Sequence, residues 1–220
     1  MRTHNFHTLP TMLDLALAHA PSPGRAIASA AFALDLRLGQ FVAQASEPLV
    51  AQLRLAWWRE QLGKRCEERA KGDAILDAVT LHWGENSRDL GALVDGWEQL
   101  LAGHPIADTA LIEFADGRSR IFAGLAVLAG HGRSIDEAAR AGRIWAFADL
   151  AAHSSDNAER RVILDLAEPL AGTPIHLPRT LRHLTILGEL GRSALLRGGV
   201  PLLARRRDAL KVMRLGMFGR

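Results

Sequence analysis

The stretch Leu53-Arg-Leu-Ala-Trp-Trp-Arg-Glu-Gln-Leu62 has the densest helical pattern of apolar and aromatic residues in this chain of 220 residues. Its apolar side chains and those just before it form two neighbouring stripes, Leu55, Trp58 and Leu62 on one and Leu49, Leu53 and Trp57 on the other. A helix that is apolar over more than half of its circumference is typical of the middle of a protein. We therefore predict a central helix from Pro48 to Ala70.

Arg54 has two interpretations in this helix. It lies four residues before Trp58, so that its guanidinium can stack on the indole. In the first interpretation the helix serves for packing, and its arginines extend to the rim. In the second, Arg54 lies in a pocket that receives an anionic head group. The sequence leaves both open.

The composition favours helix along the whole chain. Ala and Leu together supply about a third of the residues and Tyr is absent, a balance that favours helix over sheet. With 48% hydrophobic and 23% charged residues, the chain is predicted to be globular. The single cysteine, Cys66, excludes a disulfide framework and a Cys-rich metal site. No apolar run approaches the roughly 20 residues of a membrane span, and the first residues lack a signal-peptide core, so a cytoplasmic protein is predicted.

Gly, Pro and capping residues divide the sequence into stretches with short joints. They predict one domain over residues 1–220, an all-α bundle of about eight to ten helices. Ser46 is predicted to cap the helix that begins at Pro48, and Ser134 and Glu137 have the spacing of a capping box. The segment 154–177 is the least regular, with a helical pattern over 158–166. The other predicted helices cover residues 11–20, 25–45, 73–83, 87–102, 107–130, 134–153, 178–196 and 201–218.

The last predicted helix, at about residues 201–218, is basic and amphipathic. Residues 179–220 carry ten Arg or Lys against two acidic residues, so that this end has a charge of +8 and the rest of the chain −5, within a total of +3. The helix either docks its apolar stripe on the bundle, or contacts an anionic membrane surface or an acidic protein. No nucleic acid is expected, because no recognition motif is present. The cations predicted to make the contact are Arg205, Arg206, Arg207, Lys211 and Arg214.

Two neighbouring stretches resemble the squalene/phytoene synthase family. They are Ala31-Phe-Ala-Leu-Asp-Leu-Arg-Leu-Gly-Gln-Phe41 and, after Ser46-Glu-Pro48, Arg54-Leu-Ala-Trp-Trp-Arg59. An Ala-Phe helix, a short joint and an Arg-Leu-x-Trp-Trp-Arg helix follow one another in the same order in that family. Leu177-Pro-Arg-Thr-Leu-Arg-His-Leu184 is similar to the end of its bacterial members. The resemblance implies the isoprenoid synthase fold, an all-α bundle with a central cavity for a prenyl chain.

Catalytic members of that family condense two prenyl diphosphates, and two Asp-rich motifs on facing helices hold the Mg²⁺ ions that bind the diphosphate. The resemblance places the first carboxylates at Arg37, Leu38 and Phe41, none of which can ligate magnesium. The second motif is expected within residues 143–153, where Asp149 is the one mid-helix acid. The tyrosines common in the family are also absent. We therefore predict no catalytic residue and no metal site.

Acidic residues elsewhere have simpler explanations. Asp35 lies two residues before the expected motif, turned by about 200° around the helix, and is predicted to be a solvated or capping charge. Asp149 and His153 are predicted to form a polar pair on the surface. Asp73 is predicted to cap its helix. Cys66 has no evident base, so a catalytic thiol is not predicted.

These observations predict a catalytically degenerate member of the family, similar to the branch of complex I assembly factors and their bacterial relatives. Such a protein binds an isoprenoid or quinone-like chain, or acts as an assembly partner peripheral to the inner membrane. The alternative is an active Mg²⁺-dependent prenyl transferase of isoprenoid biosynthesis that recruits Asp35, Asp149 or other acids. Only in that case is Mg²⁺ a cofactor, and otherwise none is predicted. The candidate pocket consists of Arg37, Phe41, Arg54, Trp58 and Asp149.

Overall fold

The computed structural model describes residues 11–45, 47–103 and 105–203, together with residues 208, 212 and 214–216. All regular secondary structure in these ranges is helical, which confirms the predicted all-α class. The α-helices described are α1 (Thr11–Leu17), α2 (Ser22–Ala43), α3 (Pro48–Gly63), α4 (Ala74–Trp83), α5 (Gly91–Gln99), α6 (Asp108–Leu128), α7 (Ile135–His153), α8 (Asn157–Ala171) and α9 (Arg182–Leu195).

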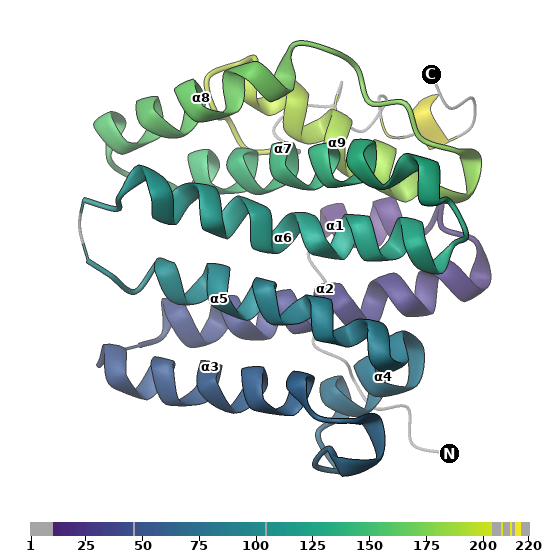
Figure 1. Cartoon of the computed structure of the whole chain (residues 1–220). Helices are drawn as coiled ribbons and strands as arrows, with labels where there is room; N and C mark the ends of the chain where they lie inside the picture. The colour runs from purple at the N-terminus through teal and green to yellow at the C-terminus, as the bar shows by residue number, and fades with distance from the viewer. Residues whose placement is uncertain are drawn as a thin grey trace.

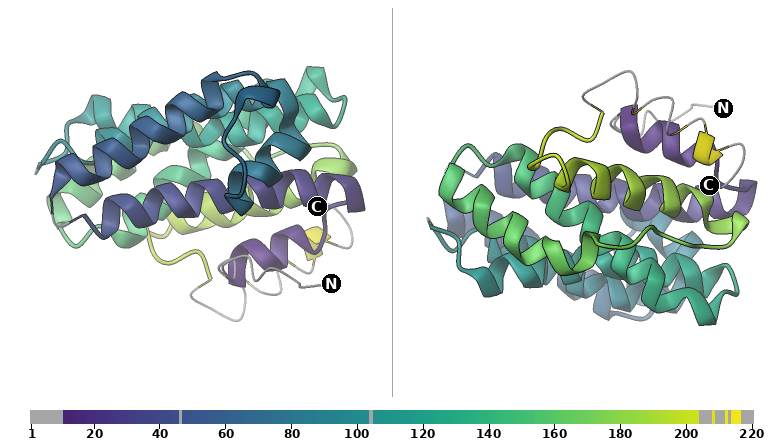
Figure 2. Two further views of the ribbon diagram at one scale, coloured as in Figure 1. Left: turned by 90° about the horizontal axis from the view of Figure 1, so that it is seen from below. Right: turned by 90° about the horizontal axis from the view of Figure 1, so that it is seen from above.

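Helices α6 and α7 lie side by side across the middle of the bundle (Figure 1). Helix α5 packs against α6, and α8 and α9 pack against α7. Helix α2 runs lengthwise through the bundle and contacts α4, α5 and α6, while α1 packs outside it next to α9 (Figure 2). One cluster of buried apolar side chains includes residues from all these helices. The centre of the bundle is therefore the place where α2, α6 and α7 approach one another.

Most predicted helices are confirmed within a few residues of their ends. Helix α3 is shorter than predicted because Lys64 has extended backbone, with φ −72° and ψ 157°. The capping box at Ser134 is wrong, since its φ of −106° and ψ of 7° depart from the extended backbone of an N-cap and its side chain makes no cap hydrogen bond. The cap at Asp73 is confirmed: its Oδ1 accepts from the N–H groups of Ile75 and Leu76 at 2.9 and 3.0 Å. Ser46 lies outside the described residues.

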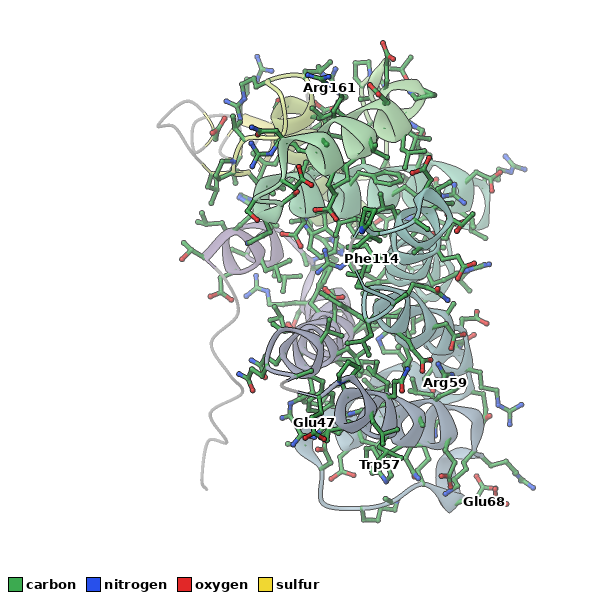
Figure 3. All side chains as sticks on the ribbon, turned by 90° about the vertical axis from the view of Figure 1, so that its left-hand side faces the viewer. Glu47, Trp57, Arg59, Glu68, Phe114 and Arg161 are labelled. Atoms are coloured by element: carbon green, nitrogen blue, oxygen red, sulfur yellow. The ribbon has the colours of Figure 1, made fainter. Side chains whose placement is uncertain are left out.

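Helix α3 lies at the edge of the bundle (Figure 1), so the prediction of a central helix is wrong. Only the stripe of Leu55, Trp58 and Leu62 is buried. The neighbouring stripe is open to solvent, with Leu49 63%, Leu53 65% and Trp57 37% exposed. Figure 3 shows Trp57 at the outer edge of the molecule. The apolar pattern does form a helix, but α2, α5 and the 3₁₀ turn Gly84–Leu90 pack on one side of it and leave the second stripe open.

By length and composition, α2 is long and apolar enough to cross a membrane, contrary to the expectation that no segment is. A core helix meets the same criteria, and Phe32, Leu34 and Leu38 of α2 are fully buried. The finding therefore carries no argument about where the protein resides.

Candidate functional site

A buried arginine lies between two carboxylates at the centre of the bundle. Arg118 of α6 is only 4% exposed. Its Nε and Nη2 each lie 3.0 Å from an oxygen of Asp35 on α2, and its Nη1 lies 2.6 Å from Oδ2 of Asp149 on α7. A single guanidinium thus joins three helices. We call these residues the Asp35–Arg118–Asp149 cluster.

Aromatic rings surround this guanidinium. Its Cζ lies 5.0 Å from the ring centroid of Trp97, 4.7 Å from that of Phe114 and 4.5 Å from that of Trp145. Figure 3 shows Phe114 inside the bundle. Trp97 Nε1 also donates a hydrogen bond of 2.8 Å to Asp35 Oδ1. The rings stabilise the cation through their π faces and replace water around it.

The spacing of residues along each helix explains the arrangement. Residues four apart share a face of a helix. Three such pairs meet here, Phe114 with Arg118 on α6, Trp145 with Asp149 on α7, and Asp35 with Gly39 on α2. A Cβ at Gly39 would lie 2.9 Å from the Trp97 ring. Gly39 therefore leaves the space in which the Trp97 indole reaches Asp35.

The charges of the cluster stabilise one another. Burial alone would lower the pKa of Arg118, but the two carboxylates raise it above its usual value. Burial raises the pKa of Asp35, and the charge of Arg118 opposes this effect. Burial also acts to raise the pKa of Asp149, yet Arg118 and His153 hold it well below its usual range. A hydrogen bond with Asp149 raises the pKa of His153 to about 9.

A magnesium site does not fit this arrangement. The carboxylates that α2 and α7 bring together are both bound to Arg118. At the positions implied for the first metal motif, Leu38 is fully buried and Arg37 Nη1 lies 3.6 Å from Asp73 Oδ2. Across the part of the chain that the structure describes, no group of three or more His, Cys, Asp or Glu could hold a metal ion.

Phe41 and Arg54 contact each other, but the residues of the predicted pocket do not form one site. Arg37 pairs with Asp73 on the surface. Arg54 lies over the ring of Phe41, with its Cζ 5.3 Å from the centroid, so the predicted stacking on Trp58 is wrong. Trp58 faces the core, whereas Arg54 faces outward from the same helix. Only Asp149 belongs to the cluster.

One prediction about an acid is wrong and another is incomplete. Asp35, expected to be a solvated or capping charge, is fully buried. Asp149 does pair with the exposed His153, with 3.4 Å between Oδ1 and Nδ1, but it also binds the buried Arg118, which was not expected. Both corrections have the same cause, since Arg118 attracts carboxylates from two helices into the core.

Sequence reasoning missed Arg118 itself, although a signal for it was present. An apolar stripe with spacings of three and four runs along α6, and Arg118 lies in its middle. The residues of this stripe are Leu111, Phe114, Arg118, Ile121 and Leu125. A cation at such a position is predicted to be buried with a partner, because an unpaired buried charge is strongly unfavourable.

The two remaining predictions concern Cys66 and the tail. Burial raises the pKa of the Cys66 thiol, which disfavours the reactive thiolate. In the tail, the described Leu202, Val212 and Leu215 are buried, as expected of docking on the bundle. Arg214 is exposed. The other four cations predicted to make contacts, Arg205, Arg206, Arg207 and Lys211, lie outside the described residues.

Comparison of the chain with protein-family models, with curated proteins and with solved structures gave no match. The squalene/phytoene synthase resemblance therefore rests on the sequence motifs alone.

Proposed function

We propose that this chain is a catalytically degenerate protein of the squalene/phytoene synthase type, which acts by binding rather than by prenyl transfer. The position of Arg118 supports this proposal. In a Mg²⁺-dependent prenyl transferase, acids on two facing helices bind the metal ions that hold the diphosphate. Here the acids of α2 and α7 do converge at the centre of the bundle, but a guanidinium is their shared partner.

The alternative, an active prenyl transferase, would recruit Asp35, Asp149 or other acids. Asp35 and Asp149 become available to Mg²⁺ only if Arg118 leaves them, and breaking a buried ion pair of this kind costs about 3–5 kcal/mol. Trp97, Phe114 and Trp145 would also have to move, because their rings lie around the guanidinium. Both requirements favour a binding function.

Diphosphate release distinguishes the two functions. We expect the pure protein, incubated with farnesyl or geranylgeranyl diphosphate and Mg²⁺, to release no more diphosphate than a heat-killed control. Release that exceeds this control and is lost in Asp149→Asn, but kept in the surface variant Asp136→Asn, would show that the chain is an enzyme. Asp136 is a suitable control because it lies on the same helix, in its first turn.

The exposed stripe of α3 favours a second candidate function, attachment to a lipid surface. Leu49, Val50, Leu53 and Trp57 lie on one side of a helix at the edge of the bundle and are all exposed. Such a contiguous stripe differs from single exposed apolar residues, which are common on any protein. A helix of this kind inserts its apolar face between lipid head groups, where Trp is favoured at the boundary. This face is distinct from the basic tail, for which the sequence predicts a membrane contact as one of several alternatives.

Leu53→Glu should reduce binding of the protein to vesicles of phosphatidylcholine and phosphatidylglycerol by at least about fivefold, because a carboxylate opposes insertion. Co-sedimentation measures the bound fraction. Leu81→Glu is the matched control, since Leu81 is an exposed leucine on α4, outside the stripe. Equal binding by the two variants would contradict attachment through α3.

A further inference from the structure

A pocket of about 350 Å³ opens at the end of the bundle where α2 begins, α6 ends and α9 begins, toward the right in Figure 1. It is separate from the Asp35–Arg118–Asp149 cluster and from the exposed stripe of α3. Three segments build it: the first turns of α2 with Pro21 just before them, the end of α6, and the 3₁₀ turn Arg179–Leu181 with the start of α9. The residues that line it are Pro21, Pro23, Gly24, Ile27, Leu125, Leu128, Ala129, Thr180, Leu181 and His183.

The lining is almost entirely apolar. Leu125 and Leu181 are buried beneath the opening, whereas Pro21, Ala129 and Thr180 are exposed around it. Proline has no backbone N–H to offer a ligand, and the Thr180 hydroxyl already shares a hydrogen bond with Nε2 of His131. None of the lining residues carries a carboxylate, an ammonium or a guanidinium group. The surroundings therefore favour an uncharged ligand with a large apolar part.

His183 is the exception in this lining. It is only 2% exposed, and neither Nδ1 nor Nε2 has a hydrogen-bond partner among the residues that the structure describes. Burial lowers its pKa to about 4, so the ring is neutral at physiological pH and has one N–H donor and one nitrogen acceptor. Buried polar groups in proteins are nearly always paired, and an unpaired one calls for an explanation. Both nitrogens are covered by protein, so a ligand in the pocket would supply the missing partner once the ring, which lines the pocket, turns one nitrogen toward it.

We infer that this pocket binds a small, uncharged and mostly apolar molecule with one hydroxyl or carbonyl group, which forms a hydrogen bond with His183. A hydroxyl matches the ring best, because it can donate to the bare nitrogen or accept from the N–H. A carboxylate or an ammonium group is disfavoured, since its charge would lose water without gaining an opposite charge. Pockets of this size are typical of small-molecule sites in which a few polar groups orient an apolar ligand.

Octan-1-ol and octanoate test this inference, because they have the same chain length and differ in the charge of the head group. We expect octan-1-ol to bind saturably with one site in isothermal titration calorimetry, and to shift the ring resonances of His183 in NMR spectra. Octanoate should bind at least about tenfold more weakly. Absence of saturable octan-1-ol binding, or equal affinity for octanoate, would overturn the inference.

Two variants locate the site. Ala129→Trp fills the mouth of the pocket and leaves His183 in place, so it should lower the affinity for octan-1-ol at least about tenfold. Ala158→Trp on α8 is its control, because Ala158 is equally exposed and lies outside the pocket. His183→Phe should lower the affinity to a similar degree, and Ala129→Trp alone decides the outcome if that variant does not fold. Unchanged affinity in Ala129→Trp would place the alcohol elsewhere and refute the site.

Discussion

Replacing Arg118 by Met should lower the free energy of unfolding by about 3–5 kcal/mol, because the change removes the cation and leaves the fully buried Asp35 without its ion-pair partner. Methionine keeps much of the length of the arginine stem and fits among the rings of Trp97, Phe114 and Trp145. Urea denaturation followed by circular dichroism measures the effect.

Arg59→Met is the matched control for this experiment. Like Arg118, Arg59 binds two carboxylates, those of Asp95 and Glu98. Its side chain is 40% exposed, however, so water screens both pairs and the loss should stay below about 1 kcal/mol. If the free energy of unfolding falls equally in the two variants, burial of the Asp35–Arg118–Asp149 cluster adds nothing to the stability of the protein.

Removing the unpaired charge of Asp35 should restore part of the stability that Arg118→Met loses. In the double variant Arg118→Met with Asp35→Asn, no anion remains at the fully buried position, and Trp97 Nε1 can still donate to the amide oxygen. We expect the double variant to be more stable than Arg118→Met alone by about 1–3 kcal/mol. The opposite order would show that the hydrogen bond from Trp97 Nε1 is enough to hold the Asp35 carboxylate without the arginine.

Acidification should remove roughly 3 kcal/mol of stability through His183 as the pH falls from 6.5 to 4. In the unfolded chain the imidazole takes up a proton near its ordinary pKa of 6.5, whereas in the folded protein burial lowers this pKa to about 4. Between these values the unfolded state binds more protons, so stability decreases with decreasing pH. Denaturation at a series of pH values measures the slope.

His183→Phe should flatten this acidic slope, because phenylalanine takes up no proton. An acidic slope that persists unchanged in His183→Phe would contradict the assignment to this residue.

His153 should give a slope of stability against pH on the alkaline side. Its pKa in the folded protein is raised to about 9, so its contribution is complete below pH 6.5 and is lost as the pH rises through 9. His153 is exposed, and solvent reduces the size of this contribution.

The sequence predicted the helical class and most helix positions because these depend on nearby residues. The 3.6-residue period of apolar side chains and the cap at Asp73 act within one or two turns. The candidate site was less predictable, because four residues of the predicted pocket, Arg37, Phe41, Arg54 and Trp58, come from a single stretch of chain. They lie on two neighbouring helices, and in the structure Arg54 contacts Phe41, whereas Arg37 pairs with Asp73 and Trp58 faces the core.

The sequence by itself determined that this chain forms amphipathic helices, and that acids are missing at the positions where the resemblance implies them. Only the tertiary structure decided which apolar stripe of α3 is covered, because that depends on the placement of α2 and α5. The pairing of Asp35 with Arg118 spans 83 residues of chain, and no local pattern connects the two. Burial of His183, which has no hydrogen-bond partner among the described residues, likewise results from three segments that meet only in the folded bundle.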